Sequence, residues 1–504
     1  MHTSLKLASL NQPFTAITSD SRKVKAGALF LAYPGAKNDG RQYIPQAIEA
    51  GAAAIVWEQD SFTWNADWQV CNVGISNLKQ QVGEIAAEYY HYPSEQLTMI
   101  GVTGTNGKTS VSQWVAQCLA SIGQKTAVLG TIGNGFVSAQ PEPLADAANT
   151  TPDAILLQGM LSEFVAQQAD AVVMEVSSHG LEQGRVNGVV FDIAVLTNLT
   201  RDHLDYHVTM EAYAAAKQKL FAWEGLGFAI LNADDAFGQT LAKVLKSQEK
   251  PYVTYGFETK NADISANISA SNLQLHDAGL SMQVTTPQGV AQITASVLGR
   301  FNAYNLLAVL ATLLSLDISL DDAVIAIAQI KPVLGRMQKF GGSELPLVVI
   351  DYAHTPDALE KVLTTLKEQI TLKGQDNVPA RLICVFGCGG NRDAGKRPLM
   401  GAIASKLADL VIVTSDNPRG ESPAAIANDI ISGMSNGYVL EADRAAAIHQ
   451  AIQSALPGDI VLVAGKGHED YQEISGVKHA FSDALVVQSA LQQYQTTNTS
   501  GASL

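Results

Sequence analysis

Cysteine is scarce in this sequence. Its 504 residues include four cysteines, Cys71, Cys118, Cys384 and Cys388. Four are too few for a disulfide framework in a chain of this length, and none has the paired spacing of a zinc site. The Cys384-x-x-x-Cys388 pair is better explained by a buried strand residue followed by a loop residue than by a redox couple. We therefore expect reduced thiols in a cytoplasmic protein.

Long apolar runs and an excess of basic residues are also missing. No uninterrupted apolar run approaches the roughly 18 residues that can span a bilayer, and the first residues lack the apolar core of a signal peptide. Lys and Arg number 33 against 48 Asp and Glu, which gives a net charge of −15. We expect neither membrane insertion nor nucleic-acid binding. Small anions can still bind where basic groups, Mg²⁺ or helix N-termini concentrate.

The composition instead predicts several compact domains. Hydrophobic residues make up 47% of the chain and charged residues 16%, a balance typical of globular proteins. Short apolar runs that end in polar or Gly residues alternate with helical patterns, which predicts an α/β fold with parallel sheets buried on both faces. The expected strands lie at 97–100, 171–176, 193–196, 228–231, 347–350, 382–386, 410–413 and 460–464.

The strongest motif is the glycine-rich segment 101–110, which follows one expected strand and opens a helix whose apolar face runs from Val111 to Ile122. Lys108 can reach the β- and γ-phosphates of a nucleoside triphosphate, and a hydroxyl of Thr109 or Ser110 can hold Mg²⁺. Val102 replaces the first glycine of the common pattern, so the loop is a variant. A tight turn without a ligand is the alternative. The expected nucleotide contacts are Gly104, Thr105, Asn106, Gly107, Lys108, Thr109 and Ser110.

Three domains are expected: a small N-terminal α/β domain (1–96), a central P-loop ATPase-like parallel-sheet domain (97–335) and a C-terminal Rossmann-like α/β domain (336–504). The polar segment 91–96 separates the first two, and the second boundary is placed at Gly335-Arg336. Alternation with period two around 273–284 predicts a small antiparallel insertion in the central domain. The last eleven residues are polar, and we expect them to fray.

Polar residues end two further strands of the central domain. Glu175 ends one, and His203 follows the other. Ligands gather at the carboxyl ends of parallel strands, so both residues can hold Mg²⁺, although Mg²⁺ prefers oxygen ligands and each residue alone can simply be a hydrogen-bonding group. Lys217 lies in an Ala-rich helical segment, and its spacing alone predicts a solvated helix lysine.

Together these motifs resemble the ATP-dependent Mur ligases, which build the peptide stem of bacterial cell-wall precursors. The resemblance covers nearly the whole chain. Within the family, three motifs resemble those of the members that add the third amino acid of the peptide stem. One of them, Asp-Asn-Pro-Arg, resembles the form found in members that use meso-diaminopimelate. These motifs are 19–22, 416–419 and 465–469. The segments that resemble the family as a whole are 101–110, 149–153, 175–179, 198–203, 216–217, 299–302, 335–336 and 351–356.

The resemblance implies that ATP converts a carboxylate of UDP-N-acetylmuramoyl-L-alanyl-D-glutamate to an acyl phosphate, which the amine of meso-diaminopimelate attacks to form an amide. It implies one Mg²⁺ at Thr109 or Ser110 and at Glu175. A second Mg²⁺ is implied at His203 and at Lys217, carbamylated by CO₂. Lys108, Glu175, His203 and Lys217 are the implied catalytic residues. Further ATP contacts are implied for Asn302, Arg336 near the γ-phosphate and Asp351 near the ribose, with His354 a weaker candidate.

The resemblance also implies two sets of substrate contacts. Those for the muramoyl dipeptide are Ser19, Ser21, Ala36, Lys37, Asn38, Asn149, Thr150, Thr151, Ser177, Gln183 and Arg185. Those for diaminopimelate are Arg392, Asp416, Asn417, Pro418, Arg419, Gly465 and Glu469. Ordinary turn chemistry is the alternative for Ser21 and Asn38. Arg419 and Arg392 would bind the carboxylate that distinguishes diaminopimelate from lysine.

Other functions stay open at this point. A ligase of the same kind can use L-lysine, and a folylpolyglutamate-synthase-like ligase would share the central and C-terminal domains but not the first. From a different class, a nucleotide-gated binding protein would change conformation without forming an amide, and a plain NTPase or kinase would transfer phosphate elsewhere. We expect a monomer.

Overall fold

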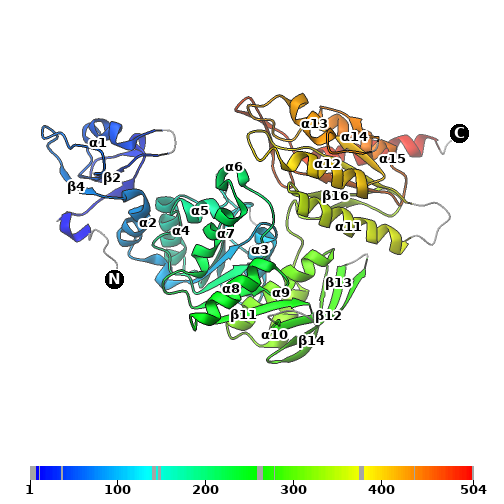
Figure 1. Cartoon of the computed structure of the whole chain (residues 1–504), viewed down its shortest axis with the longest axis horizontal. Helices are drawn as coiled ribbons and strands as arrows, with labels where there is room; N and C mark the ends of the chain where they lie inside the picture. Colours follow the sequence, from blue (N-terminus) through cyan, green and yellow to red (C-terminus); the bar gives the residue numbers. More distant parts are fainter. Residues whose placement is uncertain are drawn as a thin grey trace. The chain divides into compact units, whose positions relative to one another are not determined.

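The structure is a computed structural model, and it describes residues 7–10, 12–35, 38–138, 144–145, 149–257, 265–276, 279–373, 380–435 and 437–501. Figure 1 shows the helices and strands of the chain, coloured along the sequence. The chain divides into two compact units, each built from several segments. The first unit comprises Met1–Thr103, Leu119–Val195 and Ala215–Ala229. The second comprises Gly104–Cys118, Leu196–Ala214 and Ile230–Leu504.

A four-stranded parallel sheet opens the first unit, in the order β1-β2-β3-β4. Alternate residues of β2 face opposite sides. Leu29 and Leu31 pack with α2, whereas Phe30 packs with α1. Burial on both faces explains the apolar character of this strand. The elements are β1 (Ala16–Thr18), β2 (Ala28–Ala32), α1 (Ile44–Glu49), β3 (Ala54–Glu58), β4 (Cys71–Ile75) and α2 (Leu78–Tyr89).

The middle of the chain forms a ten-stranded sheet in the order β14-β13-β12-β11-β10-β9-β5-β8-β6-β7. Strands β5 and β6 pair in parallel with β8, and β12, β13 and β14 form the expected antiparallel insertion. The bounds are β5 (Thr98–Thr103), β6 (Thr126–Gly130), β7 (Gly133–Phe136), β8 (Ala171–Glu175), β9 (Ile193–Leu196), β10 (Phe228–Asn232), β11 (Tyr252–Phe257), β12 (Ile268–His276), β13 (Gly279–Thr286) and β14 (Gly289–Ala295).

The helix after the phosphate loop is slightly shorter than its apolar pattern predicts. It is α3 (Lys108–Ser121), and Ile122 lies beyond its end with 39% of its surface exposed, so the predicted last position of the buried face is wrong. The other helices of the middle segment are α4 (Ala154–Ala166), α5 (Ser178–Glu182), α6 (Leu204–His207), α7 (Met210–Phe221), α8 (Ala236–Ser247), α9 (Arg300–Ser315) and α10 (Leu320–Ala328).

The C-terminal segment is a six-stranded sheet in the order β15-β16-β20-β17-β18-β19, parallel except for edge strand β15. A separate hairpin, β21-β22, follows it. The bounds are β15 (Gln338–Gly341), β16 (Leu347–Asp351), α11 (Pro356–Lys373), β17 (Leu382–Phe386), α12 (Lys396–Leu407), β18 (Leu410–Val413), α13 (Pro423–Ile431), β19 (Val439–Leu440), α14 (Arg444–Ser454), β20 (Ile460–Ala464), β21 (Tyr471–Ile474), β22 (Val477–Ala480) and α15 (Asp483–Gly501).

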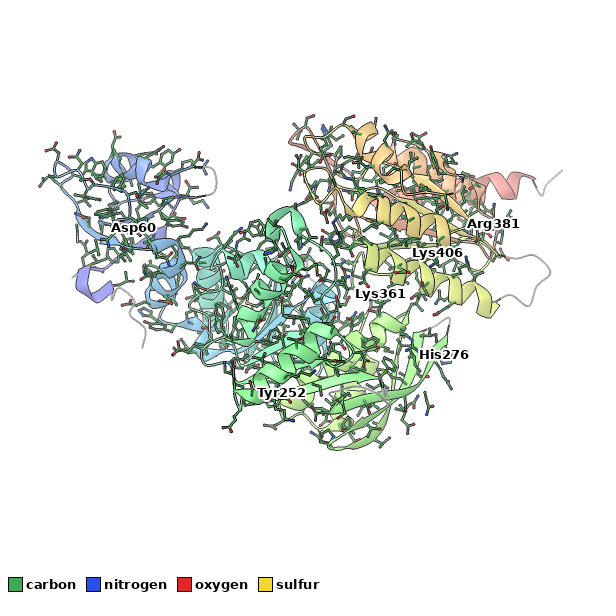
Figure 2. All side chains as sticks on the ribbon, viewed as in Figure 1. Asp60, Tyr252, His276, Lys361, Arg381 and Lys406 are labelled. Atoms are coloured by element: carbon green, nitrogen blue, oxygen red, sulfur yellow. The ribbon has the colours of Figure 1, made fainter. Side chains whose placement is uncertain are left out.

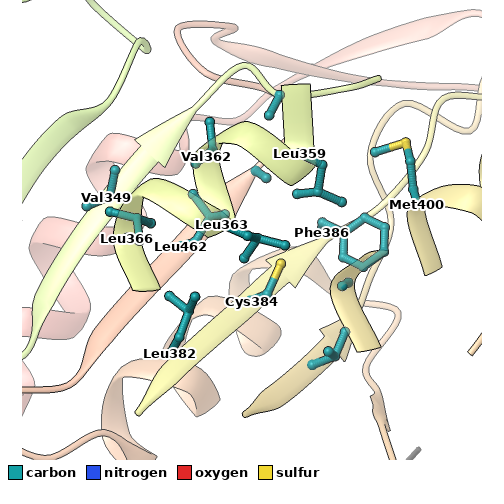
Figure 3. Packing of buried hydrophobic residues seen from close by; sticks show 14 of the residues in the cluster. Val349, Leu359, Val362, Leu363, Leu366, Leu382, Cys384, Phe386, Met400 and Leu462 are labelled. Carbon is teal, nitrogen blue, oxygen red and sulfur yellow. The ribbon is translucent and has the colours of Figure 1, made fainter. Parts of the chain in front are cut away.

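Helices cover both faces of this sheet. Leu382, Cys384 and Phe386 of β17 pack with α11 and α12 (Figure 3), and the alternate residues Ile383 and Val385 pack with α14 and α15. Cys384 and Cys388 are free, buried thiols as expected, and burial raises the pKa of each to about 12. The chemistry of this segment therefore does not involve a reactive thiolate.

The C-terminal helix corrects one prediction. Helix α15 continues past residue 494, where fraying was expected, because Tyr494 is buried and its hydroxyl donates to the carbonyl of Ala455 at 3.1 Å. Within the described part of the chain, no helix combines the length and the apolar character needed to cross a lipid bilayer.

A fully buried ion pair ties the ends of two strands together. Arg444, at the start of α14, pairs with Asp483, at the start of α15, at 2.7 Å. The same guanidinium donates to the carbonyls of Ser415, after β18, and Ala464, at the end of β20. Burial lowers the pKa of Arg444, but the adjacent Asp483 carboxylate raises it more. The loops that follow both strands are thus held by one charged group.

Removal of one partner should destabilise the second unit strongly. Asp483→Asn leaves Arg444 buried without a counter-charge, which should lower the free energy of unfolding by about 3–5 kcal/mol. Denaturant unfolding monitored by circular dichroism provides the measurement. Lys361→Met is the control, because Lys361 (Figure 2) forms a half-buried pair with Asp357 one helical turn away, and pairs spaced in this way on a helix contribute about 0.3–0.5 kcal/mol. Equal losses for the two variants would contradict the assignment.

Candidate active site

Asn198 holds the backbone of the phosphate loop. Its carbonyl accepts from the N–H of Thr105 at 2.8 Å, and its side chain both accepts from the N–H of Asn106 and donates to the Asn106 carbonyl, each at 3.0 Å. Thr197 Oγ1 donates to the same carbonyl at 2.6 Å. The peptide of Asn106 is therefore fixed by residues that follow β9, at the carboxyl edge where ligands of parallel sheets gather.

The loop concentrates positive charge. Helix α3 begins at Lys108, and the Lys108 ammonium donates to the carbonyls of Gly104 and Thr105, each at 2.9 Å. The N–H groups of the first helical turn have no carbonyl partners within the helix, so they favour an anion at this end. The loop thus fits the phosphates of a nucleotide. Thr109 and Ser110, predicted to hold Mg²⁺, are both buried in the first turn.

Asn305 joins this group, although the sequence reasoning missed it. A Cβ at Gly107, where φ is +87°, would lie 2.5 Å from Asn305 Oδ1, so only glycine permits this approach. Asn305 also donates to Asn302 Oδ1 at 2.9 Å, and both side chains are buried. Its position three residues after Asn302 on α9 was the available signal, because such residues share a helix face.

Arg336 lies beside the predicted Mg²⁺ ligand Thr109. Its Nη2 donates to Thr109 Oγ1 at 2.9 Å, and its guanidinium lies 4.5 Å from the centre of the Tyr352 ring. Asp351 accepts from the N–H of Met337 at 2.8 Å. Burial raises the pKa of Asp351 despite the opposing effect of Arg336. The structure thus brings Arg336 to the phosphate loop and places Asp351 in a desolvated position at the end of β16.

A buried carboxylate missed by the sequence reasoning lies next to His203. Asp202 Oδ2 is 3.4 Å from His203 Nε2 and 3.8 Å from His354 Nε2, and Oδ1 is 3.7 Å from Lys396 Nζ. Burial raises the pKa of Asp202, but the hydrogen bond from His354 and the charges of its basic neighbours hold it well below its usual range. Asp202 therefore orients both histidines singled out from the sequence.

In the first unit, Glu175 is oriented by Thr131, another residue that the sequence reasoning missed. The N–H of Thr131 donates to Glu175 Oε1 at 2.8 Å and its hydroxyl approaches Oε2 at 3.1 Å. The Thr131 hydroxyl is also 3.1 Å from that of Thr150.

Lys217 is 1% exposed, so the expectation of a solvated lysine from spacing alone is wrong. Lys219, two residues later, is exposed and pairs with Glu182.

Four predicted muramoyl contacts cluster in the same unit. Thr151 Oγ1 lies 3.0 Å from the hydroxyl of Ser177, and Arg185 donates to the Thr151 carbonyl at 2.8 Å. The Arg185 guanidinium is also held by Gln183 Oε1 through two hydrogen bonds of 2.9 and 2.7 Å. These contacts fix a guanidinium beside hydroxyl groups, an arrangement suited to a substrate carboxylate or phosphate.

The remaining muramoyl predictions are more dispersed. Ser19 hydrogen-bonds the side chain of Tyr33, and Ser21 donates to Gln46 at 2.9 Å. The carbonyl of Asn38 accepts a hydrogen bond from the N–H of Gly35, a contact that an ordinary turn would also make. Asn149 is exposed, and Ala36 and Lys37 lie outside the described residues.

The predicted diaminopimelate contacts converge in the second unit. Arg419 donates to the carbonyl of Gly390 at 2.9 Å, and its Nε lies 3.3 Å from Glu473 Oε2. A Cβ at Gly389 would lie 2.8 Å from Arg419 Nη1 and 3.8 Å from Arg392 Cγ, so this glycine makes room beside both arginines. Arg419 has a φ of +51°, a left-handed backbone fixed by hydrogen bonds to Glu473 and Ser475.

Asp416 and Glu469, two further predicted diaminopimelate contacts, are carboxylates of the same unit. Asn417 donates to Glu469 Oε2 at 2.8 Å, and Gly465 donates its N–H to the Asp351 carbonyl at 3.1 Å. Asp416 is buried, and none of the described residues offers a hydrogen bond to its Oδ1. Since Pro418 links Asn417 to Arg419, one short loop presents opposite charges to a ligand. Such a loop suits a zwitterionic amino acid.

The donor chemistry of the Mg²⁺ candidates fits that ion. Hydroxyls of Thr109 and Ser110 and the carboxylate of Glu175 are hard oxygen donors. Over the described ranges, no group of three or more His, Cys, Asp or Glu side chains is placed to hold a metal.

Three segments of the chain match family models. Residues 13–90 match the Mur ligase family catalytic domain, residues 102–313 the Mur ligase middle domain, and residues 335–467 the Mur ligase glutamate ligase domain. These segments follow one another along the chain in an order consistent with the motifs described above.

Relatives match over nearly the full length. The chain is 52% identical over 487 residues to the UDP-N-acetylmuramoyl-L-alanyl-D-glutamate--2,6-diaminopimelate ligase of Chromobacterium violaceum, covering 96% of each chain. It is 49% identical over 500 residues to the ligase of that name from Nitrosomonas europaea, covering 97% of this chain and 95% of the relative.

Solved structures give the same result. A structure of a ligase with that name matches with a TM-score of 0.68 and 37% identity, covering 98% of this chain and 100% of the other. A folylpolyglutamate synthase from Mycobacterium tuberculosis, complexed with ADP and AMPPCP, has a similar fold at a TM-score of 0.62 and 17% identity, over 77% of this chain and 92% of its own. The full-length relatives and the three matched segments together establish that this chain belongs to the Mur ligase family.

Proposed function

We propose that the chain is an ATP-dependent ligase that joins meso-diaminopimelate to UDP-N-acetylmuramoyl-L-alanyl-D-glutamate in peptidoglycan precursor synthesis. The observation that carries the choice of amino acid is the loop 416–419, in which Arg419 follows Asp416 and Asn417 directly and Asn417 donates to Glu469 at 2.8 Å. Relatives about half identical over almost the full chain carry the name of this activity. The substrates, the two Mg²⁺ ions and the residue roles below are parts of the proposal.

ATP phosphorylates the substrate carboxylate, because a carboxylate is a poor electrophile until one of its oxygens becomes a leaving group. Transfer between two anions requires charge neutralisation and alignment. Lys108 and the N-terminus of α3 supply positive charge at the β- and γ-phosphates, and Arg336, held against Thr109 at 2.9 Å, neutralises the γ-phosphate. Asn302 and Asn305 bind the nucleotide from α9, and Asp351 binds the ribose.

Two Mg²⁺ ions are assigned to the proposed reaction. The first would be held by Thr109, Ser110 and Glu175, and the second by His203 and carbamylated Lys217. When bound, Mg²⁺ supplies positive charge to the phosphate oxygens. The N–H of Thr131 donates to the carboxylate of Glu175, and Asp202 Oδ2 lies 3.4 Å from His203 Nε2, so each proposed ligand has a polar neighbour that favours one orientation.

Carbamylation explains a lysine buried on a helix of a Mg²⁺-dependent enzyme. Burial disfavours the ammonium form of lysine, and a neutral amine can take up CO₂ to become a carbamate. The modified Lys217 carries a negative charge and two oxygens, which are ligands that Mg²⁺ prefers.

The amino-acid pocket selects for a second carboxylate. The distal end of meso-diaminopimelate carries one ammonium and one carboxylate, whereas that of lysine carries only the ammonium. The carboxylate would receive charge-assisted hydrogen bonds from Arg419 and Arg392, and the ammonium would face Asp416 and Glu469. Lysine would leave the Arg419 guanidinium without its ligand partner, which disfavours lysine.

The remaining substrate contacts divide between proposed domains. Residues 1–96 would bind the UDP end through Ser19, Ser21 and the turn that contains Asn38. Residues 97–335 would bind ATP and, through Asn149, Thr150, Thr151, Ser177, Gln183 and Arg185, the muramoyl peptide. Residues 336–504 would bind diaminopimelate. A folylpolyglutamate synthase is less well supported, because its fold match covers 77% of this chain, against 98% for the ligase structure.

Phosphate release from ATP tests the function directly. With the UDP-muramoyl dipeptide present, meso-diaminopimelate should release phosphate, whereas L-lysine and D-glutamate should not, because neither satisfies both ends of the pocket. Phosphate release with lysine would support the ligase activity but contradict the proposal that Arg419 selects for diaminopimelate. Release without any amine would instead indicate an NTPase or a nucleotide-gated binding protein.

Arg419→Ala tests amino-acid selection. Loss of charge-assisted hydrogen bonds of about 1.5–3 kcal/mol each should lower kcat/KM for meso-diaminopimelate by about 100-fold or more, with the KM for ATP nearly unchanged. Lys406→Ala removes an exposed positive charge from α12 of the same unit (Figure 2) and serves as the control. Similar kinetics for Arg419→Ala and the parent would remove the selectivity argument.

Lys217→Ala tests the carbamate. The variant should lose most of its turnover, and added formate or acetate should restore part of it by supplying the missing carboxylate near the metal. Lys219→Ala is the matched control, since Lys219 is an exposed lysine on the same helix. Full activity of Lys217→Ala without a carboxylate would rule the carbamate out.

A further inference from the structure

One buried lysine of the amino-acid pocket has no role in the function described so far. Lys466 follows Gly465 in the loop after β20, and its side chain is 0% exposed. An ammonium group loses much of its hydration on burial, so hydrogen-bond acceptors and negative charges must offset the free-energy cost of that loss. The groups that compensate Lys466 therefore indicate what it does.

All three polar partners of the Lys466 ammonium are predicted diaminopimelate contacts. Its Nζ donates to Asn417 Oδ1 and to Glu469 Oε2, each at 3.0 Å, and lies 3.6 Å from Asp416 Oδ1. The lysine thereby connects the loop after β18 to the loop after β20. The other cation of the loop after β18, Arg419, is paired instead with Glu473 at 3.3 Å.

Further hydrogen bonds make this set rigid. Asn417 Nδ2 donates to the same oxygen of Glu469 at 2.8 Å, and Asn417 Oδ1 also accepts from the N–H of Glu473 at 2.9 Å. Tyr352 approaches the other Glu469 oxygen at 3.5 Å. Glu469 Oε1 is therefore held more weakly by the protein than Oε2, and the buried Asp416 Oδ1 receives no hydrogen bond from the described residues.

Charge balance gives the arrangement its chemical meaning. Asp416 and Glu469 carry two negative charges, and Lys466 offsets one of them. The remaining single negative charge matches one ammonium group of an amino acid, whereas two uncompensated carboxylates in a buried pocket would repel each other. Arg444 also interacts electrostatically with Asp416 and Glu469, but its charge is balanced by Asp483 at 2.7 Å, as that of Arg419 is by Glu473 at 3.3 Å, so neither arginine changes the net charge of the group.

We propose that Lys466 is a positioning residue for amino-acid binding, which holds Glu469, Asn417 and Asp416 in place and sets the pocket to a single negative charge for the distal ammonium of the substrate. This inference rests on the proposed function. It adds a specificity role for a lysine that binds other protein groups rather than the substrate itself.

Lys466→Gln is the first test, because glutamine keeps a hydrogen-bond donor but removes the charge. The KM for meso-diaminopimelate should rise about tenfold or more, the loss expected when a charged hydrogen-bond donor is removed. The KM for ATP, the KM for the UDP-muramoyl dipeptide and kcat should change by less than about threefold, since Lys466 contacts neither of these substrates in the proposed arrangement.

Lys478→Gln is the matched control. Lys478 lies 3.9 Å from the centre of the Tyr471 ring, and Lys466 lies 5.5 Å from the same ring, but Lys478 is exposed on β22. This control should keep the parent kinetics. Lys466→Met, which retains much of the side-chain volume without a charge, is the second variant if Lys466→Gln does not fold, and thermal melting checks the folding of each protein.

An unchanged KM for meso-diaminopimelate in a folded Lys466 variant would overturn the proposal. So would parallel losses for all three substrates, because they would indicate a general packing role. If the parent enzyme itself prefers another amino acid, the proposed function is wrong, and the same comparison with that amino acid still decides the role of Lys466. The two failures are thus distinguishable.

Discussion

The ion pair between Arg444 and Asp483 is the constraint on which the amino-acid pocket depends. Its guanidinium binds the carbonyls that directly precede Asp416 and Gly465, so two loops that arise from different strands keep a fixed separation. The positions of the residues on those loops, including Lys466 and Arg419, therefore depend on this ion pair. A buried pair adds little net stability compared with well-packed apolar residues, but it specifies one arrangement of its neighbours in a way that apolar contacts do not.

Much of the fold was predictable because strands buried on both faces leave a clear pattern. The ends of β9, β17, β18 and β20 agree with their apolar runs, since polar or glycine residues follow each run directly. Ends that depend on tertiary contacts were harder. Helix α15 continues beyond its apolar positions because Tyr494 finds a partner on another segment, and no local pattern carries that information.

In the candidate site as well, local sequence motifs were predictable, whereas residues that depend on tertiary contacts were not. The phosphate loop was predictable because its chemistry lies in consecutive residues, and the residues proposed to bind the amino acid were inferred from short family motifs. Thr131, Asp202 and Lys466 were missed because each acts on a side chain that was itself the recognisable feature. Lys466 even lies inside a quoted motif, yet its role depends on Asn417, a residue 49 positions away in sequence. Supporting residues leave weak signals because many polar side chains can perform the same task.

The left-handed backbone at Arg419 limits how this pocket can change during evolution. A φ of +51° is held by hydrogen bonds to the hairpin that follows the pocket, so any replacement must occupy a conformation that branched side chains adopt only with strain. Glycine and asparagine tolerate it best, whereas valine, isoleucine and threonine do not. Replacements at this position are therefore confined to a narrow set of residues that tolerate a left-handed backbone.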